Sequence, residues 1–155
     1  MAIPYYHVDA FTGELFAGNP AGVCILSAFL ADSIMQKIAA ENRHSETAFV
    51  PRADGDFDLR WFTPKVEDDL CVHATLASAY VLALRKHNVW PVRFHTRSGM
   101  LTVAQDQDGP MLRELRTTGG EGGAKAPAEK RASPNVRSNQ MPSCRAILSV
   151  LRASA

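Results

Sequence analysis

The most informative part of the hydrophobic pattern is residues 73–84, which contain no charged residue. This stretch is rich in Ala and Leu and predicts a helix, with Arg85 beyond its end, where positive charge suits the helix dipole. A helix that is apolar on every face must be buried on every face. The pattern therefore predicts an α+β fold, in which a curved β-sheet (a half-barrel) wraps around one central apolar helix.

Short apolar or alternating runs predict strands on both sides of this helix. They are residues 3–11, 23–26, 46–50, 58–63, 92–96 and 101–103. A turn is expected at residues 18–20 (Gly-Asn-Pro). A second helix is expected over residues 33–41, with Asp32 as its N-cap. Its apolar positions at helical spacing are Ile34, Met35, Ile38 and Ala39.

Composition divides the chain into two parts. Residues 1–112 carry nine Lys/Arg and thirteen Asp/Glu, whereas residues 113–155 carry eight Lys/Arg and three Glu. All twelve aromatic residues and all five histidines lie at or before His95. The first part is expected to be the folded lobe. The second, rich in Gly, Ala, Pro and Arg, is expected to be a disordered tail, because it cannot bury enough apolar surface to offset its ordering entropy.

Several classes of protein are excluded by the same composition. No apolar run approaches the ~20 residues of a membrane span, and the N-terminus has no pattern of a secretory signal. Three widely spaced cysteines do not make a disulfide framework, so we expect a reducing, cytoplasmic location. A net charge of +1 argues against a nucleic-acid partner.

The first candidate for chemistry is Ser45-Glu46, at the entrance to the apolar strand predicted at residues 46–50. A carboxylate beside Ala48 and Phe49 is expected to be partly desolvated. Desolvation raises the pKa of a carboxyl group and suits it to general acid–base work. The alternative interpretation is an ordinary surface Glu at a strand edge.

The second candidate is Cys71-Val72-His73, at the start of the apolar helix. Free N–H groups at a helix N-terminus form a site for a carboxylate. A thiol there is expected to have a depressed pKa, and a histidine there can transfer protons. The alternative is a small buried Cys and a His that caps the helix.

The acidic run Glu67-Asp68-Asp69 precedes this site and is expected to be a solvated loop. It lacks a His partner at a recognised metal-ligand spacing, so no metal site is predicted. The sequence has no Walker loop, no Gly-rich dinucleotide motif and no Cys-x-x-Cys motif. Chemistry without a cofactor is therefore expected.

Several further stretches accompany these motifs along the chain. They are residues 8–12 (Val-Asp-Ala-Phe-Thr), 16–24 (Phe-Ala-Gly-Asn-Pro-Ala-Gly-Val-Cys), 35–39 (Met-Gln-Lys-Ile-Ala), 41–42 (Glu-Asn), 45–49 (Ser-Glu-Thr-Ala-Phe), 60–64 (Arg-Trp-Phe-Thr-Pro), 70–71 (Leu-Cys) and 73–77 (His-Ala-Thr-Leu-Ala). In order and spacing, over roughly residues 4–105, these stretches resemble the phenazine-biosynthesis-like (PhzF-like) isomerase family. The resemblance implies a diaminopimelate-epimerase-like fold of two lobes, with the active site between them at the N-termini of two central helices.

The resemblance also implies roles for particular residues. Glu46 takes the place of the family's main proton-transfer residue, and His73 that of a histidine lining the site. The candidate substrate-binding residues are Ser45, Asn19, Cys71, Val72, His73 and Ala74. The implied activity is cofactor-independent proton transfer on a small carboxylated metabolite.

This chain departs from the family pattern in three places. Val72 stands where the family usually has Gly, which predicts strain if the backbone there needs a positive φ. Residues 43–44 are Arg-His where Asn-Leu is frequent. No second lobe is recognisable, so we expect a truncated lobe with little turnover of its own.

Two further hypotheses stay open from the sequence. The first is a cysteine-type racemase or epimerase using Cys71, which would need a second thiolate across the cleft. The second is a non-catalytic lobe that only binds, forming a homodimer or pairing with another chain through its exposed inter-lobe face.

Overall fold

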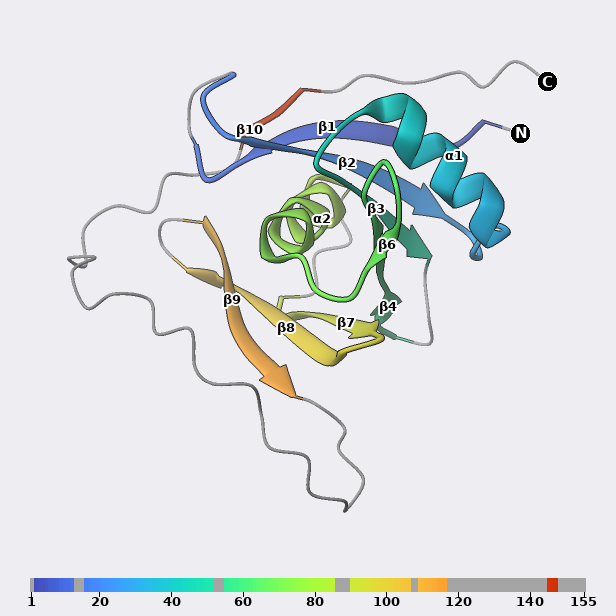
Figure 1. Ribbon diagram of the computed structural model, residues 1–155. Coiled ribbons are helices and arrows are strands. Elements are labelled where there is room, and N and C mark those ends of the chain that lie inside the picture. Colours follow the sequence, from blue (N-terminus) through green and yellow to red (C-terminus); the bar gives the residue numbers. More distant parts are fainter. Residues whose placement is uncertain are drawn as a thin grey trace, which may run out of the picture.

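The computed structural model describes residues 2–12, 16–51, 55–85, 90–106, 109–116 and 145–147. Within them the chain forms two sheets and two helices (Figure 1). The six-stranded sheet has the order β10-β1-β2-β3-β5-β6 and the four-stranded sheet the order β4-β7-β8-β9. The strands are β1 (Tyr5–Ala10), β2 (Asn19–Leu26), β3 (Glu46–Pro51), β4 (Phe57–Asp58), β5 (Arg60–Phe62), β6 (Glu67–Asp68), β7 (Val92–Thr96), β8 (Gly99–Asp106), β9 (Gly109–Arg116) and β10 (Arg145–Ile147).

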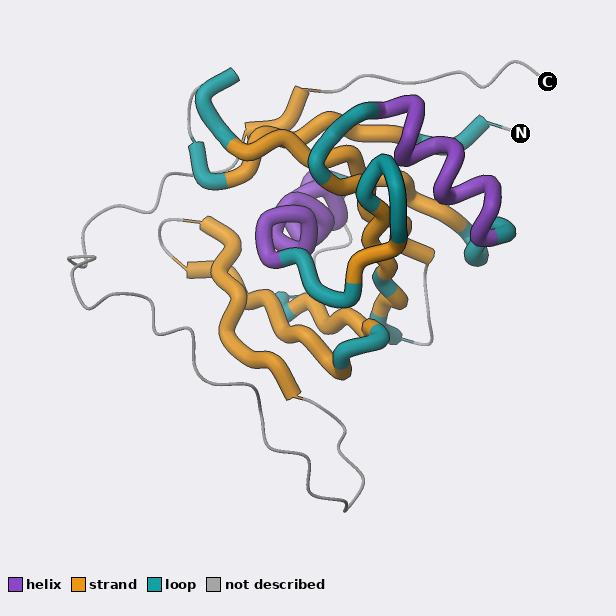
Figure 2. The backbone as a smooth tube through the Cα atoms, viewed as in Figure 1, coloured by secondary structure: helices purple, strands orange, loops and turns teal. Residues whose placement is uncertain are grey.

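The helix α2 (Val72–Leu84) lies between the two sheets (Figure 2). Most of its side chains are buried, and they join a core with residues from both sheets, among them Val23, Trp61 and Phe94. Its two buried hydroxyls bond to the backbone one turn earlier: Thr75 donates to the carbonyl of Cys71 at 2.6 Å, and Ser78 to that of Ala74 at 2.7 Å. The α+β fold around an apolar central helix is therefore confirmed, although two sheets, rather than the one curved sheet predicted, enclose the helix.

The second helix, α1 (Asp32–Asn42), covers the outer face of the larger sheet. It connects β2 to β3, which are parallel neighbours and so need a crossover connection. Met35 and Ala39 are buried against the sheet, whereas Ile34 is exposed. Asp32 is the first helical residue and its side chain makes no cap hydrogen bond, so its predicted role as N-cap is wrong.

The run predicted as a single strand at residues 58–63 is divided between the two sheets. β4 pairs with β7 in the smaller sheet, and β5 pairs with β3 in the larger one. Leu59, fully buried between them, is where the chain passes from one sheet to the other. This transfer joins the two sheets beside α2.

Two other sequence expectations need adjustment. The predicted turn at residues 18–20 is wrong at Asn19 and Pro20, which already belong to β2 and pair with β1. The proposed division at residue 112 falls within β9 and stays a prediction. The expected disorder of the tail is wrong at residues 113–116, which belong to β9, and at residues 145–147, which form β10 and pair with β1. The rest of the tail, residues 117–144 and 148–155, lies outside the described residues. Neither described helix is long and apolar enough to cross a membrane.

Candidate active site

Glu46 is positioned by the end of α1 and by the pairing of β3 with β2. Arg43 takes a left-handed conformation (φ 56°), and its N–H bonds back to the carbonyl of Ala39, which ends the helix. The Ser45 hydroxyl then donates to the carbonyl of Pro20 at 3.3 Å. Glu46 follows as the first residue of β3, in register with Ala21. Its side chain is only 16% exposed, so the interpretation as a surface Glu is wrong.

The start of α2 is held in place by two arginines that bind the preceding acidic segment. Arg60 makes two hydrogen bonds to the Glu67 carboxylate, of 2.6 and 2.8 Å. Arg97 lies 3.1 Å from the same carboxylate. The hydrogen bonds from Arg60 lower the pKa of Glu67. The prediction of a solvated loop is therefore wrong for Glu67, which is largely buried in β6.

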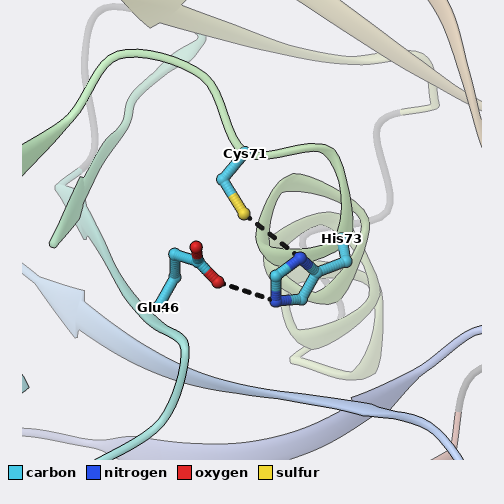
Figure 3. A group of neighbouring side chains, drawn as sticks. All are labelled: Glu46, Cys71 and His73. Carbon is cyan, nitrogen blue, oxygen red and sulfur yellow. Dashed lines mark hydrogen bonds and ion pairs between the residues drawn. The ribbon is translucent and has the colours of Figure 1, made fainter. Parts of the chain in front are cut away.

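The end of α1 places the start of β3, and the arginine contacts place the start of α2, so that the two starts lie next to each other. The imidazole of His73 lies between the thiol of Cys71 and the carboxylate of Glu46 (Figure 3). Its Nδ1 atom is 3.2 Å from Sγ of Cys71, and its Nε2 atom is 3.2 Å from Oε2 of Glu46. Nε2 is also 3.3 Å from Oγ of Ser45. The alternative in which His73 caps the helix is wrong, since α2 has no side-chain cap.

Burial is the main influence on the pKa values of Cys71 and His73. It raises the pKa of the Cys71 thiol to about 12, although the backbone N–H of Ala74 acts in the opposite direction. Burial also lowers the pKa of His73, against the opposing effect of the nearby Glu46. The predicted depressed pKa of the thiol is therefore wrong, because loss of water around the sulfur outweighs the helix N-terminus.

The other predicted binding residues take different places. Val72 begins α2 with helical backbone, so the strain predicted for a positive φ is absent, and its side chain is exposed. The Ala74 side chain is buried in the core, so only its backbone can face a ligand. Asn19 is exposed at the start of β2, one residue before Pro20. Their roles in substrate binding stay predictions.

Ligand atoms of Glu46, Cys71 and His73 lie within 4.8 Å of one another, which makes this group a place where a metal ion could bind. The geometry does not suit one ion as it stands, because the thiol faces Nδ1 of the ring and the carboxylate faces Nε2. One ion can bind only one of these two nitrogens. Sequence reasoning did not predict that the three side chains form one chain of contacts.

A buried helix enclosed by β-sheets is the arrangement of one lobe of a diaminopimelate-epimerase-like fold. The chain belongs to the phenazine biosynthesis-like (PhzC-PhzF) family, whose sequence model matches residues 8–136. This assignment confirms the resemblance seen in the sequence. The matched range also extends beyond residue 112.

Individual relatives agree with this family. An uncharacterized isomerase of Pseudomonas aeruginosa is 55% identical over 109 residues, which are 70% of this chain and 42% of that protein. A phenazine biosynthesis-like domain-containing protein of Bos taurus is 45% identical, over 72% of this chain and 42% of that protein. The chain therefore spans about two fifths of the length of these relatives.

Solved structures give the same result. A PhzC/PhzF phenazine biosynthesis protein from Clostridium difficile has a TM-score of 0.66 and 52% identity, covering 69% of this chain and 42% of that one. A PhzF-family protein from Enterococcus faecalis has a TM-score of 0.66 and 47% identity, covering 70% of this chain and 42% of that one. The lobe described here therefore has the fold of this family.

Proposed function

We propose that this lobe carries the proton-transfer half of a cofactor-independent isomerase that acts on a small carboxylated metabolite. The observation that supports it most is the position of Glu46, a largely buried carboxylate at a strand entrance beside the N-terminus of α2. The isomerase names of several relatives support the class of reaction.

The proposed reaction needs no change of oxidation state. Glu46 takes a proton from an acidic C–H group, and the electron pair of that bond passes into the adjacent unsaturated or carboxyl-bearing system. Glu46 then returns the proton, on the same face of the substrate, to another carbon of that system, where the displaced electron pair forms the new C–H bond. The backbone N–H groups of Val72 and His73, in the first turn of α2, have no carbonyl partner within the helix, and they would hold the substrate carboxylate.

The opposite wall of the site would come from the part of the longer relatives that this chain does not match. A closed cleft excludes water and places acid and base on opposite sides of the substrate. We therefore expect little turnover from the 155-residue chain alone and more from a chimera. In the chimera, the residues after β9 are replaced by the corresponding remainder of the Pseudomonas aeruginosa relative.

The test is deuterium uptake from heavy water, measured by mass spectrometry on a panel of small carboxylic acids that includes L- and D-amino acids. The proposal expects at least one acid to exchange a carbon-bound proton with the chimera. Exchange with no member of a broad panel, by a folded chimera, would count against it.

A second candidate is binding without catalysis, through the apolar rim formed by Val66, Leu70 and Val72. These three side chains are 61%, 41% and 42% exposed, in and around the segment that leads into α2. Such a rim favours association. Sedimentation of the chain over a range of concentrations tests it: a homodimer weakened by Leu70→Ser supports pairing through this face. A monomer at all concentrations contradicts self-association.

A cysteine-type racemase is less well supported, because a thiol whose pKa is raised to about 12 is a poor base near neutral pH. The reducing, cytoplasmic location remains part of the proposal. The free thiols of Cys24 and Cys71 are consistent with it.

A further inference from the structure

Cys71 has a contact that the proposed reaction does not use. Its sulfur is buried directly ahead of α2 and lies 3.2 Å from Nδ1 of His73. The opposite ring nitrogen, Nε2, faces Ser45 and Glu46. Because a neutral imidazole has one N–H and one lone pair, the surroundings of its two nitrogens decide which of them carries the proton.

The atoms next to Nε2 are hydrogen-bond acceptors, so Nε2 is expected to carry the N–H that donates to them. The Ser45 hydroxyl gives its proton to the carbonyl of Pro20, which leaves its oxygen free to accept. Oε2 of Glu46 is buried and makes no well-aligned hydrogen bond, and Nε2 is 3.2 Å away. A lone pair at Nε2 would face the lone pairs of this oxygen across 3.2 Å, with no proton between the two atoms. The proton therefore belongs on Nε2, and Nδ1 must accept.

The charge states agree with this assignment. The acidic groups facing the pair, Glu46 on β3 and Asp68 on β6, both disfavour a thiolate at Cys71, as burial does. Burial disfavours a charged His73, although Glu46 favours it. In a doubly protonated ring Nδ1 would also carry a proton, so it could not accept a hydrogen bond from the S–H group of Cys71. Both groups are therefore neutral. The thiol proton has two acceptors nearby, the Glu46 carboxylate and Nδ1 of His73, and Nδ1 lies 3.2 Å from the sulfur, so we assign the donation to Nδ1.

We propose that Cys71 is a positioning residue, whose S–H group donates to Nδ1 of His73 and holds the ring neutral, with its N–H on Nε2 directed at Ser45 and Glu46. In the isomerase reaction this would fix Oε2 of Glu46 and leave Oε1 to carry the exchanging proton. That catalytic consequence rests on the proposed function, whereas the protonation pattern does not.

The test is a pH titration of the 155-residue chain by ¹⁵N NMR of its histidine rings, because the shifts separate protonated from unprotonated nitrogens. His73→Gln identifies the His73 signals. We expect Nε2 to be protonated and Nδ1 unprotonated at neutral pH. Loss of a donor that favours the neutral ring should raise the pKa of His73 in Cys71→Ala. Cys71→Ser keeps a donor and should hold that pKa closer to the wild-type value.

Three results would overturn the proposal. Protonation of Nδ1 in the wild-type chain would reverse the tautomer. A fall in the His73 pKa in Cys71→Ala would reveal a thiolate–imidazolium pair and favour the racemase hypothesis. An unchanged pKa in a folded Cys71→Ala variant would leave the thiol only a packing role. If the Cys71→Ala variant does not fold, the proposal is tested by the tautomer of His73 in the wild-type chain and by the pKa of His73 in Cys71→Ser. None of these readouts depends on turnover, so a lack of exchange activity leaves them interpretable.

Discussion

The Nε2 atom of His73 lies 3.2 Å from Oε2 of Glu46, and this contact joins the first turn of α2 to the first residue of β3. In the sequence, Glu46 precedes and His73 follows the acidic segment at residues 67–69, which is bound by Arg60 and Arg97. The site is therefore built on a helix end and a strand end, each fixed by its own hydrogen bonds. Such supports can hold a proton-transfer group in a constant position.

The thiols of Cys71 and Cys24 should be inert to alkylation in the folded chain. Both are buried, and burial raises the pKa of each to about 12, so almost no thiolate is present at neutral pH. Iodoacetamide followed by peptide mass spectrometry should show slow labelling of both, and rapid labelling after denaturation. Rapid labelling of Cys71 alone in the folded chain would indicate a reactive thiolate.

Substitutions along α2 should separate its buried positions from its exposed end. Leu82 is fully buried, whereas Leu84 is 48% exposed. Leu82→Ala should cost about 2–5 kcal/mol in the free energy of unfolding, because it leaves a cavity among packed side chains. Leu84→Ala makes the same chemical change and should cost less than about 1 kcal/mol. Urea denaturation measures both, and equal effects would contradict an enclosed helix.

The left-handed residue at the end of α1 should be a point where stability can be gained. Arg43 has φ 56° and an exposed side chain, and glycine adopts this conformation without steric cost. Arg43→Gly should raise the free energy of unfolding by roughly 0.5–1 kcal/mol. Arg43→Ala, which keeps the Cβ, is the control and should give no such gain. A Gly variant less stable than the Ala variant would argue against the observed helix end.

Stability should fall in alkaline solution, in part because of Cys24. Burial raises the pKa of its thiol from 9.0 to about 12. The unfolded chain then loses this proton first as the pH rises above about 9, so deprotonation favours unfolding up to about 12. Tyr5, with a pKa raised by burial to about 12, acts in the same direction. Urea unfolding at several pH values up to about 10 should give a shallower loss for Cys24→Ala than for the wild-type chain. Equal slopes would contradict this contribution.

The sequence predicted those elements whose burial can be read from the hydrophobic pattern of their own residues. The uncharged run at residues 73–84 was sufficient for α2, because only an enclosed helix tolerates apolar side chains all round. The strand break at Leu59 could not be predicted. Alternation continues across it, and the change of sheet depends on partners distant in the chain, β3 and β7.

The candidate site shows the same limit. Motifs identified Glu46, Cys71 and His73, but not that His73 lies between the other two. The pKa of Cys71 was predicted in the wrong direction, because the helix N-terminus is local in sequence, whereas burial comes from both sheets. Glu67 looked like part of a solvated run, since its partners Arg60 and Arg97 belong to β5 and to the β7–β8 turn.

The central claim is that Glu46 carries the exchanging proton, and Glu46→Gln tests it most directly. This change keeps the size of the side chain and removes its proton-carrying oxygen. In the chimera, with an acid that the wild-type form deuterates, Glu46→Gln should lower the exchange rate about 100-fold or more. Glu41→Gln, the same change at an exposed position on α1, should leave it unaltered. Full exchange by a folded Glu46→Gln chimera would contradict the account.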